Sequence, residues 1–518
     1  MKTAASHCKS IANFIIRFRF EFLLGTILLV VLGLRLFVLS YPLMDNTEAG
    51  RDYWVGRHIA LYKEFPLVGP WNDVLGGYFN SPIYYYFIGL LVAIRDDFLF
   101  LSIVNILLQL STAVIIYMLG KKLFSPHAGL IAVILFLFSW EAWFQSKVIW
   151  QPHVMQPLIN LSFLLFLLSY EKKKYWILLS SIIAFSLAVV MHNSAGALAL
   201  VYAPLVWFVL KRQKGSYGDY AVATGTGFLV LSLSYLPVII FAKNNNLSLF
   251  NFHSGRDPFS MTSWHQNFMD NIFEMLKVFF INIRKEFFSL EMILLLCLAM
   301  LLILYSVRLK SQSRRQKTFL LILLVVLQPL FLSSLVNLQI ARHHFMPILG
   351  IGAILIAELC CVLIEKNRFS YIISGIFIFF LVKASSANFF LFYDRSSSNI
   401  ANEAIIALEM SLPKRRNFAS ALYGFDIKLY NPIVLNPYEE FFWALLEKRT
   451  DVKFTSFHDN SLPTLKVDNQ GRDVFLICQG MAKETCLNRF SQEEPHHTMM
   501  KEIFTREPYH IYPTSLKQ

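Results

Sequence analysis

Three carboxylates and one guanidinium directly follow the first long apolar run of the chain: Asp45, Glu48, Asp52 and Arg51. If the stretch TEAGRDYWVGRHIALYKE is helical, Glu48 and Asp52 are four residues apart and share one face. A carboxylate beside an Arg at a membrane surface supplies a base for an acceptor and a cation for a leaving phosphate. The pattern indicates transfer from a lipid-linked phosphate donor. The alternative is a solvated helix cap, a common setting for acids next to a membrane span.

The composition places these residues in a membrane protein. The chain has 518 residues, of which 56% are hydrophobic and 16% charged, and 48 of them are Phe. So much apolar surface does not fit inside one water-facing domain, which excludes an ordinary soluble protein, a collagen and a disordered chain. The net charge of +13 does not indicate nucleic-acid binding, because Lys and Arg lie in short clusters between apolar runs and mark membrane topology.

About eleven apolar runs are long enough to cross the roughly 30 Å hydrocarbon core of a membrane. The first follows a basic leader without a small-residue cleavage site, so we interpret it as a retained span. The others lie near residues 99–119, 127–144, 154–170, 175–191, 194–210, 219–242, 288–307, 318–337, 345–364 and 369–392. The predicted fold class is mainly α, a polytopic membrane protein in which the domain 1–393 contains the spans.

The segment 81–97 decides the orientation of all later spans. It is short, contains Pro82 and carries three interfacial tyrosines from Tyr84 to Tyr86, so we interpret it as a helix along the outer membrane face. With a cytoplasmic N-terminus, the basic linkers then lie in the cytoplasm, as the positive-inside rule requires. These linkers contain Lys121 and Lys122, Lys172 to Lys174, Lys211, Arg212 and Lys214, Arg308 to Lys317, and Lys366 with Arg368.

Three regions are extracytoplasmic in this topology: a first loop at about 41–98, a second loop at about 243–287, and a C-terminal domain at 394–518. An amphipathic stretch and short β-like runs between Pro, Asn and Gly predict that the C-terminal domain is a small α/β unit. Its sequence has no nucleophile elbow, phosphate loop or metal-ligand spacing, so we interpret it as a lid or stabilising domain. Its two cysteines, Cys478 and Cys486, are predicted to form a disulfide, with two unpaired thiols as the alternative.

Several motifs between residues 20 and 215 resemble those of one enzyme family. EAGRD is similar to its acidic-x-G-R-D motif, and FPLVGPWNDVLGGYFNSPIYYYFIG resembles its P-L-x-G-P, G-G-x-F and G-P-L-Y-Y-Y series. The family's next linker is similar to YMLGKKLFSPHAGLIAVILFLFS. Its W-N-P-N outer loop is similar to IWQPHVMQP, and its following outer turn with a His is similar to VVMHNSAGAL. In this order the motifs resemble the bacterial branch of the family 39 glycosyltransferases of GT-C type, relatives of protein O-mannosyltransferases and of the lipid A aminoarabinose transferase.

The resemblance implies an inverting transfer of a sugar from a polyprenyl-phosphate donor to a hydroxyl or phosphate of a lipid, polysaccharide or protein. The reaction would take place at the outer face of a bacterial inner membrane. A single displacement needs one general base, because the lipid phosphate is already a good leaving group. Glu48 stands where the family usually has Asp and is the first candidate for the base, and Asp52 is the second. Arg51 and Arg342 are the candidate ligands of the donor phosphate.

Other polar residues on the predicted outer face are expected to bind the substrate: Asp45, Tyr84, Gln151, His153 and His192. For each histidine the alternative is an interfacial hydrogen-bond donor at a helix end. Whether the protein uses a divalent metal cofactor stays open. Gln151 stands where some relatives have Asp or Asn, which weakens the case for a metal site with two carboxylate ligands. Adjacent His343 and His344 are expected to diverge on a helix, so we do not interpret them as a metal-binding pair.

A transporter or flippase for a lipid-linked solute is the main alternative function, and a polysaccharide polymerase or ligase is another. Transporters usually have ionisable residues near mid-membrane and internal repeats. The predicted spans have few charges at their centres, chiefly Glu358 and Lys383, and we find no repeat. The acids lie at the outer surface instead, which favours an enzyme whose partners are membrane lipids and a lipid-linked donor.

Overall fold

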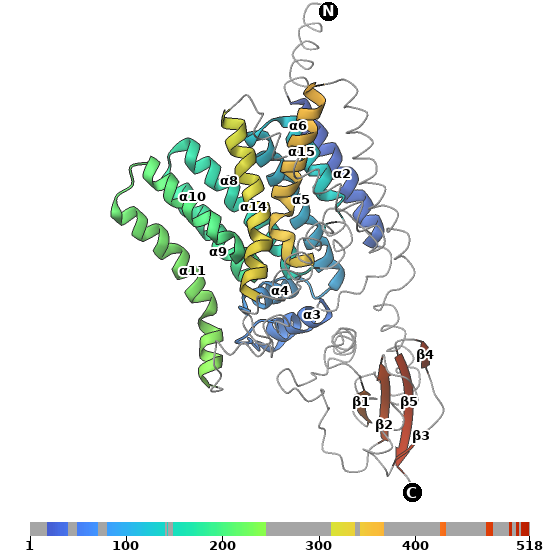
Figure 1. Ribbon diagram of the computed structural model, residues 1–518. Helices are drawn as coiled ribbons and strands as arrows, with labels where there is room; N and C mark the ends of the chain where they lie inside the picture. The colour runs from blue at the N-terminus through green and yellow to red at the C-terminus, as the bar shows by residue number, and fades with distance from the viewer. Residues whose placement is uncertain are drawn as a thin grey trace, which may run out of the picture. The chain divides into compact units, whose positions relative to one another are not determined.

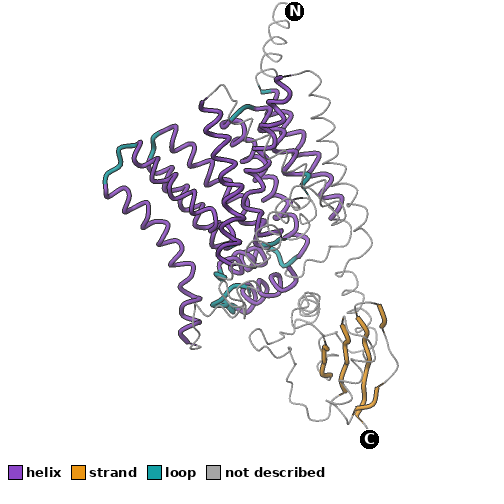
Figure 2. Tube along the Cα trace, viewed as in Figure 1, coloured by secondary structure: helices purple, strands orange, loops and turns teal. Residues whose placement is uncertain are grey.

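The computed structural model describes the helical part of the chain at residues 18–39, 49–70, 80–139, 142, 149–244, 312–336 and 342–366. It also describes strand residues 425–430, 473–479, 497–499, 504–506 and 509–516. The described residues are mainly helical (Figure 2). The chain divides into two compact units. The first comprises Met1–Val38, Pro66–Tyr85 and Leu101–Leu391, and the second comprises Leu39–Phe65, Tyr86–Phe100 and Phe392–Gln518.

Long apolar helices make up the described part of the first unit. They are α2 (Arg19–Leu39), α5 (Phe98–Leu123), α6 (Pro126–Leu137), α8 (Gln151–Lys172), α9 (Tyr175–Met191), α10 (Ala199–Arg212), α11 (Tyr217–Asn244), α14 (Gln312–Val336) and α15 (Leu349–Lys366). Two 3-10 segments, η3 (Asn193–Leu198) and η5 (Arg342–Ile348), lead into α10 and α15. Helix α8 packs against α9, α9 against α11, and α6 against α15 (Figure 1).

Six of the described segments are long and apolar enough to cross a membrane. They are Arg19–Phe37, Phe98–Leu123, Gln151–Lys172, Asn193–Arg212, Tyr217–Asn244 and His343–Val362. Each coincides with a span predicted from the sequence. The predicted spans at 288–307 and 369–392 lie outside the described residues, and the predicted span at 127–144 is helical as α6 only as far as Leu137. The protein is therefore a multi-pass membrane protein, and the total of eleven spans stays a prediction.

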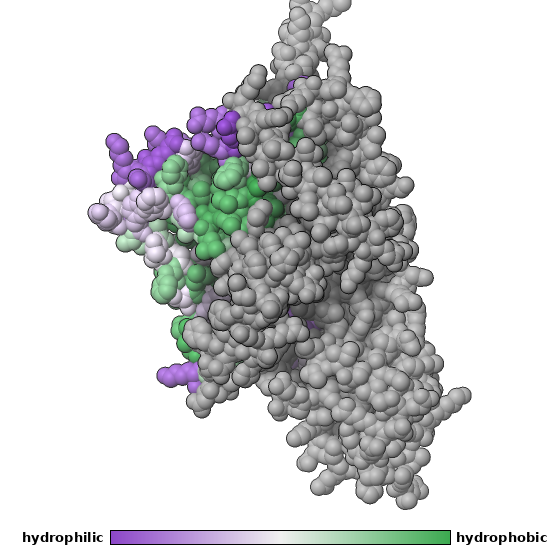
Figure 3. Space-filling view, viewed as in Figure 1, coloured by the Kyte–Doolittle hydropathy of each residue, from purple (hydrophilic) through white to green (hydrophobic). Residues whose placement is uncertain are grey.

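Large apolar side chains are exposed on four of the six candidate spans, those that contain α2, α5, α10 and α11. Leu29 of α2 and Phe228 of α11 each expose about 70% of their surface, whereas polar Gln109 and Asn160 are buried. Figure 3 shows a band of hydrophobic side chains with hydrophilic ones gathered at one end of the visible helices. This distribution is expected where lipid, not water, surrounds the helices.

The basic linkers of the first unit meet at one end of its helices. Lys121 at the end of α5 pairs with Glu21 of α2 at 2.6 Å, and Lys122 pairs with Glu171 at the end of α8 at 2.5 Å. Lys317 of α14 donates to the main-chain oxygen at the end of α5 at 2.9 Å. These described helix ends lie close together, as the predicted topology requires, and the topology itself stays a prediction. Which side faces the cytoplasm stays a prediction.

A tight turn joins α5 to α6. Ser125 caps α6, since its hydroxyl accepts from the amide of Ala128, and Pro126 occupies the first turn, where no amide donor is required. The two helices then touch through glycines: a Cβ on Gly120 would lie 2.8 Å from Cα of Gly129, and one on Gly129 would lie 2.7 Å from a main-chain oxygen of α5. Only residues without a Cβ allow this approach.

The second unit contains α3 (Ala49–Arg57), the π-helical segment η1 (His58–Tyr62), most of α4 (Ile83–Ile94) and a small sheet. Helix α4 has 12 residues, about 18 Å at 1.5 Å per residue, which is shorter than the roughly 30 Å membrane core. This length supports the interpretation of the segment 81–97 as a helix that does not cross the membrane.

The sheet has the strand order β1-β2-β5-β3, with β4 also paired to β5. Its strands are β1 (Phe425–Tyr430), β2 (Asp473–Gln479), β3 (His497–Met499), β4 (Phe504–Arg506) and β5 (Tyr509–Leu516). Strands β1 and β2 are parallel, and β5 is antiparallel to its neighbours. Strand β2 coincides with DVFLICQG, one of the short β-like runs on which the prediction of an α/β unit rests, whereas β3, β4 and β5 coincide with none of these runs. Cys478 lies in β2 opposite His510, and Cys486 lies outside the described residues, so the disulfide stays a prediction.

Candidate functional site

The acidic motif after the first span ends in an ion pair on α3. The Asp52 carboxylate is fully buried, and its Oδ1 accepts from Arg51 Nη2 at 2.8 Å and from Nε at 3.0 Å. Arg51 remains 16% exposed. Asp52 also lies in the first turn of α3, where a negative charge is favoured by the helix dipole. The buried carboxylate therefore orients a partly accessible guanidinium.

Helix α3 is fixed against α4 within the second unit. A Cβ on Gly56 would lie 2.6 Å from Cγ2 of Ile88, and a Cβ on Gly89 would lie 2.6 Å from Cγ2 of Ile59. These reciprocal contacts mean that α3 and the following turn η1 lie with their backbones close to that of α4. Such a crossing leaves α3 little freedom to slide or rotate.

Asp96, just after α4, holds α3 by hydrogen bonds. Its carboxylate accepts from the Tyr53 hydroxyl at 2.6 Å and from Arg57 Nε at 3.1 Å. Burial and the Asp96 charge raise the pKa of Tyr53 above its ordinary value, so the hydroxyl keeps the proton that it donates. The sequence analysis missed these three residues, because Tyr53 and Arg57 are about 40 residues from Asp96 in the sequence.

Helix α3 continues into a π-helical turn, which is a rare conformation often found at functional sites. His58 in this turn is buried, and its Nδ1 lies 2.8 Å from Oε2 of Glu64. Lys63 ends the turn with a left-handed φ of 60°. In the sequence, the π-helical turn therefore lies between the Arg51–Asp52 pair and the exposed residues that begin at Lys63.

Two candidate residues of the motif lie outside the described residues: Asp45 and Glu48. Helix α3 begins at Ala49, directly after Glu48. The predicted i, i+4 relation between Glu48 and Asp52 therefore stays a prediction. Arg342 is the first residue of η5, and its role in phosphate binding is likewise untested.

A second polar cluster lies in the first unit, where four elements begin or end. Helix α9 ends at Met191 and η3 begins at Asn193, while α8 begins at Gln151 and η5 leads into α15. In the predicted topology all four points belong to the extracytoplasmic side. Candidate residues Gln151 and His153 lie in the first turn of α8 and are both buried.

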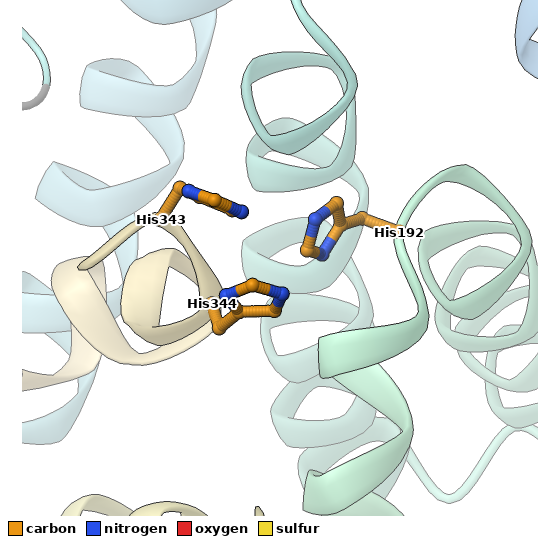
Figure 4. Close-up of side chains that lie close together, drawn as sticks. All are labelled: His192, His343 and His344. Carbon is orange, nitrogen blue, oxygen red and sulfur yellow. The ribbon is translucent and has the colours of Figure 1, made fainter. Parts of the chain in front are cut away.

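His192, His343 and His344 face one another in this cluster (Figure 4). One ligand atom of each ring lies within 4.8 Å of the others. The His343 and His344 ring centroids are 4.1 Å apart, so the prediction that these neighbours diverge is wrong. Both belong to a 3-10 segment, not to an α-helix, and both rings approach His192. Within the described residues this is the one group of three such side chains that could hold a metal ion.

The surroundings of His192 favour its neutral form. Burial and the nearby His344 lower the pKa of His192 well below its usual value. Its Nδ1 lies 2.7 Å from the Ser194 hydroxyl, which fixes the ring orientation. This leaves Nε2 as the nitrogen available to a ligand.

The polar residues next to this cluster tie the segment before α4 to the end of α9 and to α11. Asn193 donates from Nδ2 to Asn80 Oδ1 at 2.8 Å, and its own Oδ1 accepts from the Tyr235 hydroxyl at 2.5 Å. Ser81 donates to the main-chain oxygen of Ser234 at 2.7 Å. Candidate residue Tyr84 follows this anchored segment and is fully buried. The start of the segment 80–85 is thus held at the end of α9 and against the middle of α11.

Two buried polar groups within the helices were missed by the sequence analysis. Arg35 of α2 is almost fully buried and donates to Gln109 Oε1 at 2.7 Å and to the main-chain oxygen of Leu137 at 3.1 Å. Gln156 of α8 is fully buried, and neither of its amide atoms has a hydrogen-bond partner among the described residues. The sequence signal for Arg35 is a charged residue within the first apolar run.

Comparison with known proteins connects this arrangement to a fold. No protein-family profile matches the sequence, and no curated protein matches it. Among solved structures, ArnT from Cupriavidus metallidurans bound to undecaprenyl phosphate matches with a TM-score of 0.50 and 11% identity, over 96% of this chain and 98% of the ArnT chain. ArnT in the apo state matches with a TM-score of 0.50 and 10% identity, over 98% of this chain and 99% of the other. ArnT is a glycosyltransferase of the GT-C fold, and the likeness extends over nearly the whole of both chains. The protein has the GT-C glycosyltransferase fold.

Proposed function

We propose that the protein is an integral membrane glycosyltransferase that moves a sugar from a polyprenyl-phosphate donor to an acceptor hydroxyl or phosphate. The acceptor would be a lipid, polysaccharide or protein at the outer face of a bacterial inner membrane. The observation that carries this proposal is the near full-length likeness to a structure that holds undecaprenyl phosphate. The Arg51–Asp52 pair supports it, because a partly exposed guanidinium held by a buried carboxylate is suited to bind a phosphate.

The proposed reaction is a single displacement. Glu48 takes the proton of the acceptor hydroxyl, and the acceptor oxygen attacks the anomeric carbon. The bond between that carbon and the phosphate oxygen breaks, and polyprenyl phosphate leaves, so the configuration of the sugar inverts. Arg51 binds the phosphate that gains negative charge as the bond breaks. We assign Asp52 to the orientation of Arg51, since its carboxylate is already engaged by that guanidinium.

Reconstitution in proteoliposomes tests the proposal. The purified full chain is mixed with a polyprenyl-phosphate sugar, and both sugar transfer to an added acceptor and movement of the lipid between leaflets are measured. A glycosyltransferase gives transferred sugar and free polyprenyl phosphate. Lipid movement without transfer would show a flippase, chain extension of a lipid-linked polymer would show a polymerase, and transfer of a whole lipid-linked polymer would show a ligase.

The variant Glu48→Gln, which removes the proposed base, is tested in this assay. Glu171→Gln is its matched control. Glu171 is a half-exposed carboxylate at the basic end of the helices, paired with Lys122. An exposed ion pair of this kind is worth about 0–1 kcal/mol, so the control should keep its fold and its activity. Equal loss of transfer in both variants would contradict a role for Glu48 as the base.

A further inference from the structure

We propose that His192, His343 and His344 form a binding site for one divalent metal ion of the Zn²⁺ class. The inference is independent of the glycosyltransferase proposal, because it concerns metal binding and not sugar transfer. It starts from the convergence of three imidazoles from two elements that lie far apart in the sequence. His192 connects α9 to η3, while His343 and His344 belong to η5.

The distances between the rings are close to those of a metal site. One nitrogen atom of each ring lies within 4.8 Å of the others. A tetrahedral ion at about 2.0–2.1 Å from each nitrogen requires nitrogen separations of about 3.4 Å. The rings therefore need to approach by about 1–1.5 Å at most, which side-chain rotation supplies without movement of the helices.

Neighbouring groups contact the rings of His192 and His343 and the main chain of His344. The Ser194 hydroxyl engages Nδ1 of His192, in the way that metal-bound imidazoles commonly use their second nitrogen. The indole of Trp150 packs against His343, with ring centroids 4.6 Å apart. Gln328 of α14 donates to the main-chain oxygen of His344 at 2.8 Å and so holds the η5 turn. Such supporting contacts are typical of a built site and not of a chance approach of side chains.

The donor set selects the class of ion. Three imidazole nitrogens suit Zn²⁺ and similar transition metals, whereas Mg²⁺ and Ca²⁺ prefer oxygen ligands. Metal binding requires the neutral form of each imidazole. Three protein ligands also leave one tetrahedral position for a water molecule or an anionic oxygen.

Zinc content and binding affinity test the site directly. The full chain is purified in detergent without a histidine tag, stripped with a chelator, dialysed and titrated with Zn²⁺. We expect one ion per chain and a thermal unfolding temperature that rises with Zn²⁺ concentration. We also expect bound Co²⁺ to give the visible absorption of a tetrahedral nitrogen site.

Variants separate the site from adventitious binding. The double variant His343→Gln/His344→Gln should lose both the ion and the Zn²⁺-dependent rise in unfolding temperature. Ser194→Ala should weaken binding by about 10–100-fold, because it removes the group that orients His192. His127→Gln is the matched control, since His127 is exposed at the start of α6 and outside the cluster, and it should bind Zn²⁺ as the unaltered chain does.

His192→Cys keeps the test decisive if removal of two histidines impairs folding. A thiolate can replace the imidazole as a ligand, so this variant should still bind one ion and add a thiolate-to-Co²⁺ charge-transfer band. The proposal is overturned if the unaltered chain binds no more Zn²⁺ than the folded double variant. It is also overturned if Co²⁺ bound to the Cys variant shows no such band.

Discussion

At the scale of single residues, the structure assigns different positions to the charges of the acidic motif. Asp52 is buried and engaged by Arg51, whereas Arg51 is partly exposed. A carboxylate fixed in this way is better suited to hold a guanidinium than to take a proton from a substrate. Glu48 therefore stays the preferred base in the proposed mechanism.

Glu48→Gln should lower kcat for transfer by about 10²–10⁴-fold, because an amide keeps the shape of the side chain but cannot accept the proton. Asp52→Asn should lower it less, since Arg51 remains present although less firmly held. The measurement is transfer in proteoliposomes. A dead Asn variant together with an active Gln variant would exchange the two roles.

Arg51→Lys should lower kcat/KM for the lipid-linked donor by about 10–100-fold, the cost of losing one charge-assisted hydrogen bond. A Lys ammonium keeps the charge but cannot make the two-pronged contact of a guanidinium. Arg19→Lys is a matched control at the start of α2, next to the basic end of the helices. Equal donor kinetics in the Arg51→Lys variant and the unaltered chain would exclude Arg51 from phosphate binding.

At the scale of elements, glycines determine how closely helices approach. In the α5–α6 hairpin the nearest atoms to an added Cβ on Gly129 include main-chain atoms of α5, which cannot move aside as a side-chain tip can. At the α3–α4 crossing the obstructing atoms are those of Ile88 and Ile59. The first contact is therefore the less tolerant of the two.

Gly129→Ala should lower the free energy of unfolding by about 1–3 kcal/mol, as other overpacking substitutions do. Thermal unfolding in detergent measures the change. The control is Gly225→Ala in α11, where an added Cβ meets no atom within 4 Å and the better helix propensity of Ala should be neutral or stabilising. Equal stability of the Gly129→Ala variant and the unaltered chain would show that the hairpin relaxes freely.

At the scale of the whole molecule, the orientation of the chain decides on which side of the membrane the acidic motif lies and the proposed transfer takes place. The basic ends of α5, α8 and α14 lie together, so a single labelled position on that side orients all of them. The positive-inside rule assigns that side to the cytoplasm.

Cysteine labelling of intact cells should find residues near 45, 90, 265 and 450 accessible from outside and those near 122, 173, 213, 313 and 367 protected. The basic linkers provide the physical reason, because Lys and Arg are retained on the cytoplasmic side. Accessibility of position 122 from outside would reverse the topology and place the acidic motif in the cytoplasm.

The Cys478–Cys486 disulfide provides a separate test of where the C-terminal domain lies. Protein taken from its native membrane under denaturing, non-reducing conditions should show no alkylation at either position. Loop closure of this size should add roughly 2–3 kcal/mol to the free energy of unfolding. Free alkylation of both thiols would remove the bridge and count against an oxidising compartment.

Local composition determined much of the architecture. The six described spans, the short helix α4, strand β2 and the shared position of the basic linkers all followed from the sequence. The reason is that a membrane selects segments by length and summed hydropathy, which are properties of neighbouring residues. Arg51 and Asp52 could also be identified from the sequence, because they are adjacent in the chain.

Only the tertiary structure brought together groups that are distant in the chain. Asp96 with Arg57, Arg35 with Gln109, and His192 with the η5 histidines depend on how helices cross and end. Hydropathy does not encode a crossing, because the approach depends on side-chain size and shape at each contact. The histidine cluster also required a 3-10 segment, where an α-helix had been expected to separate His343 from His344.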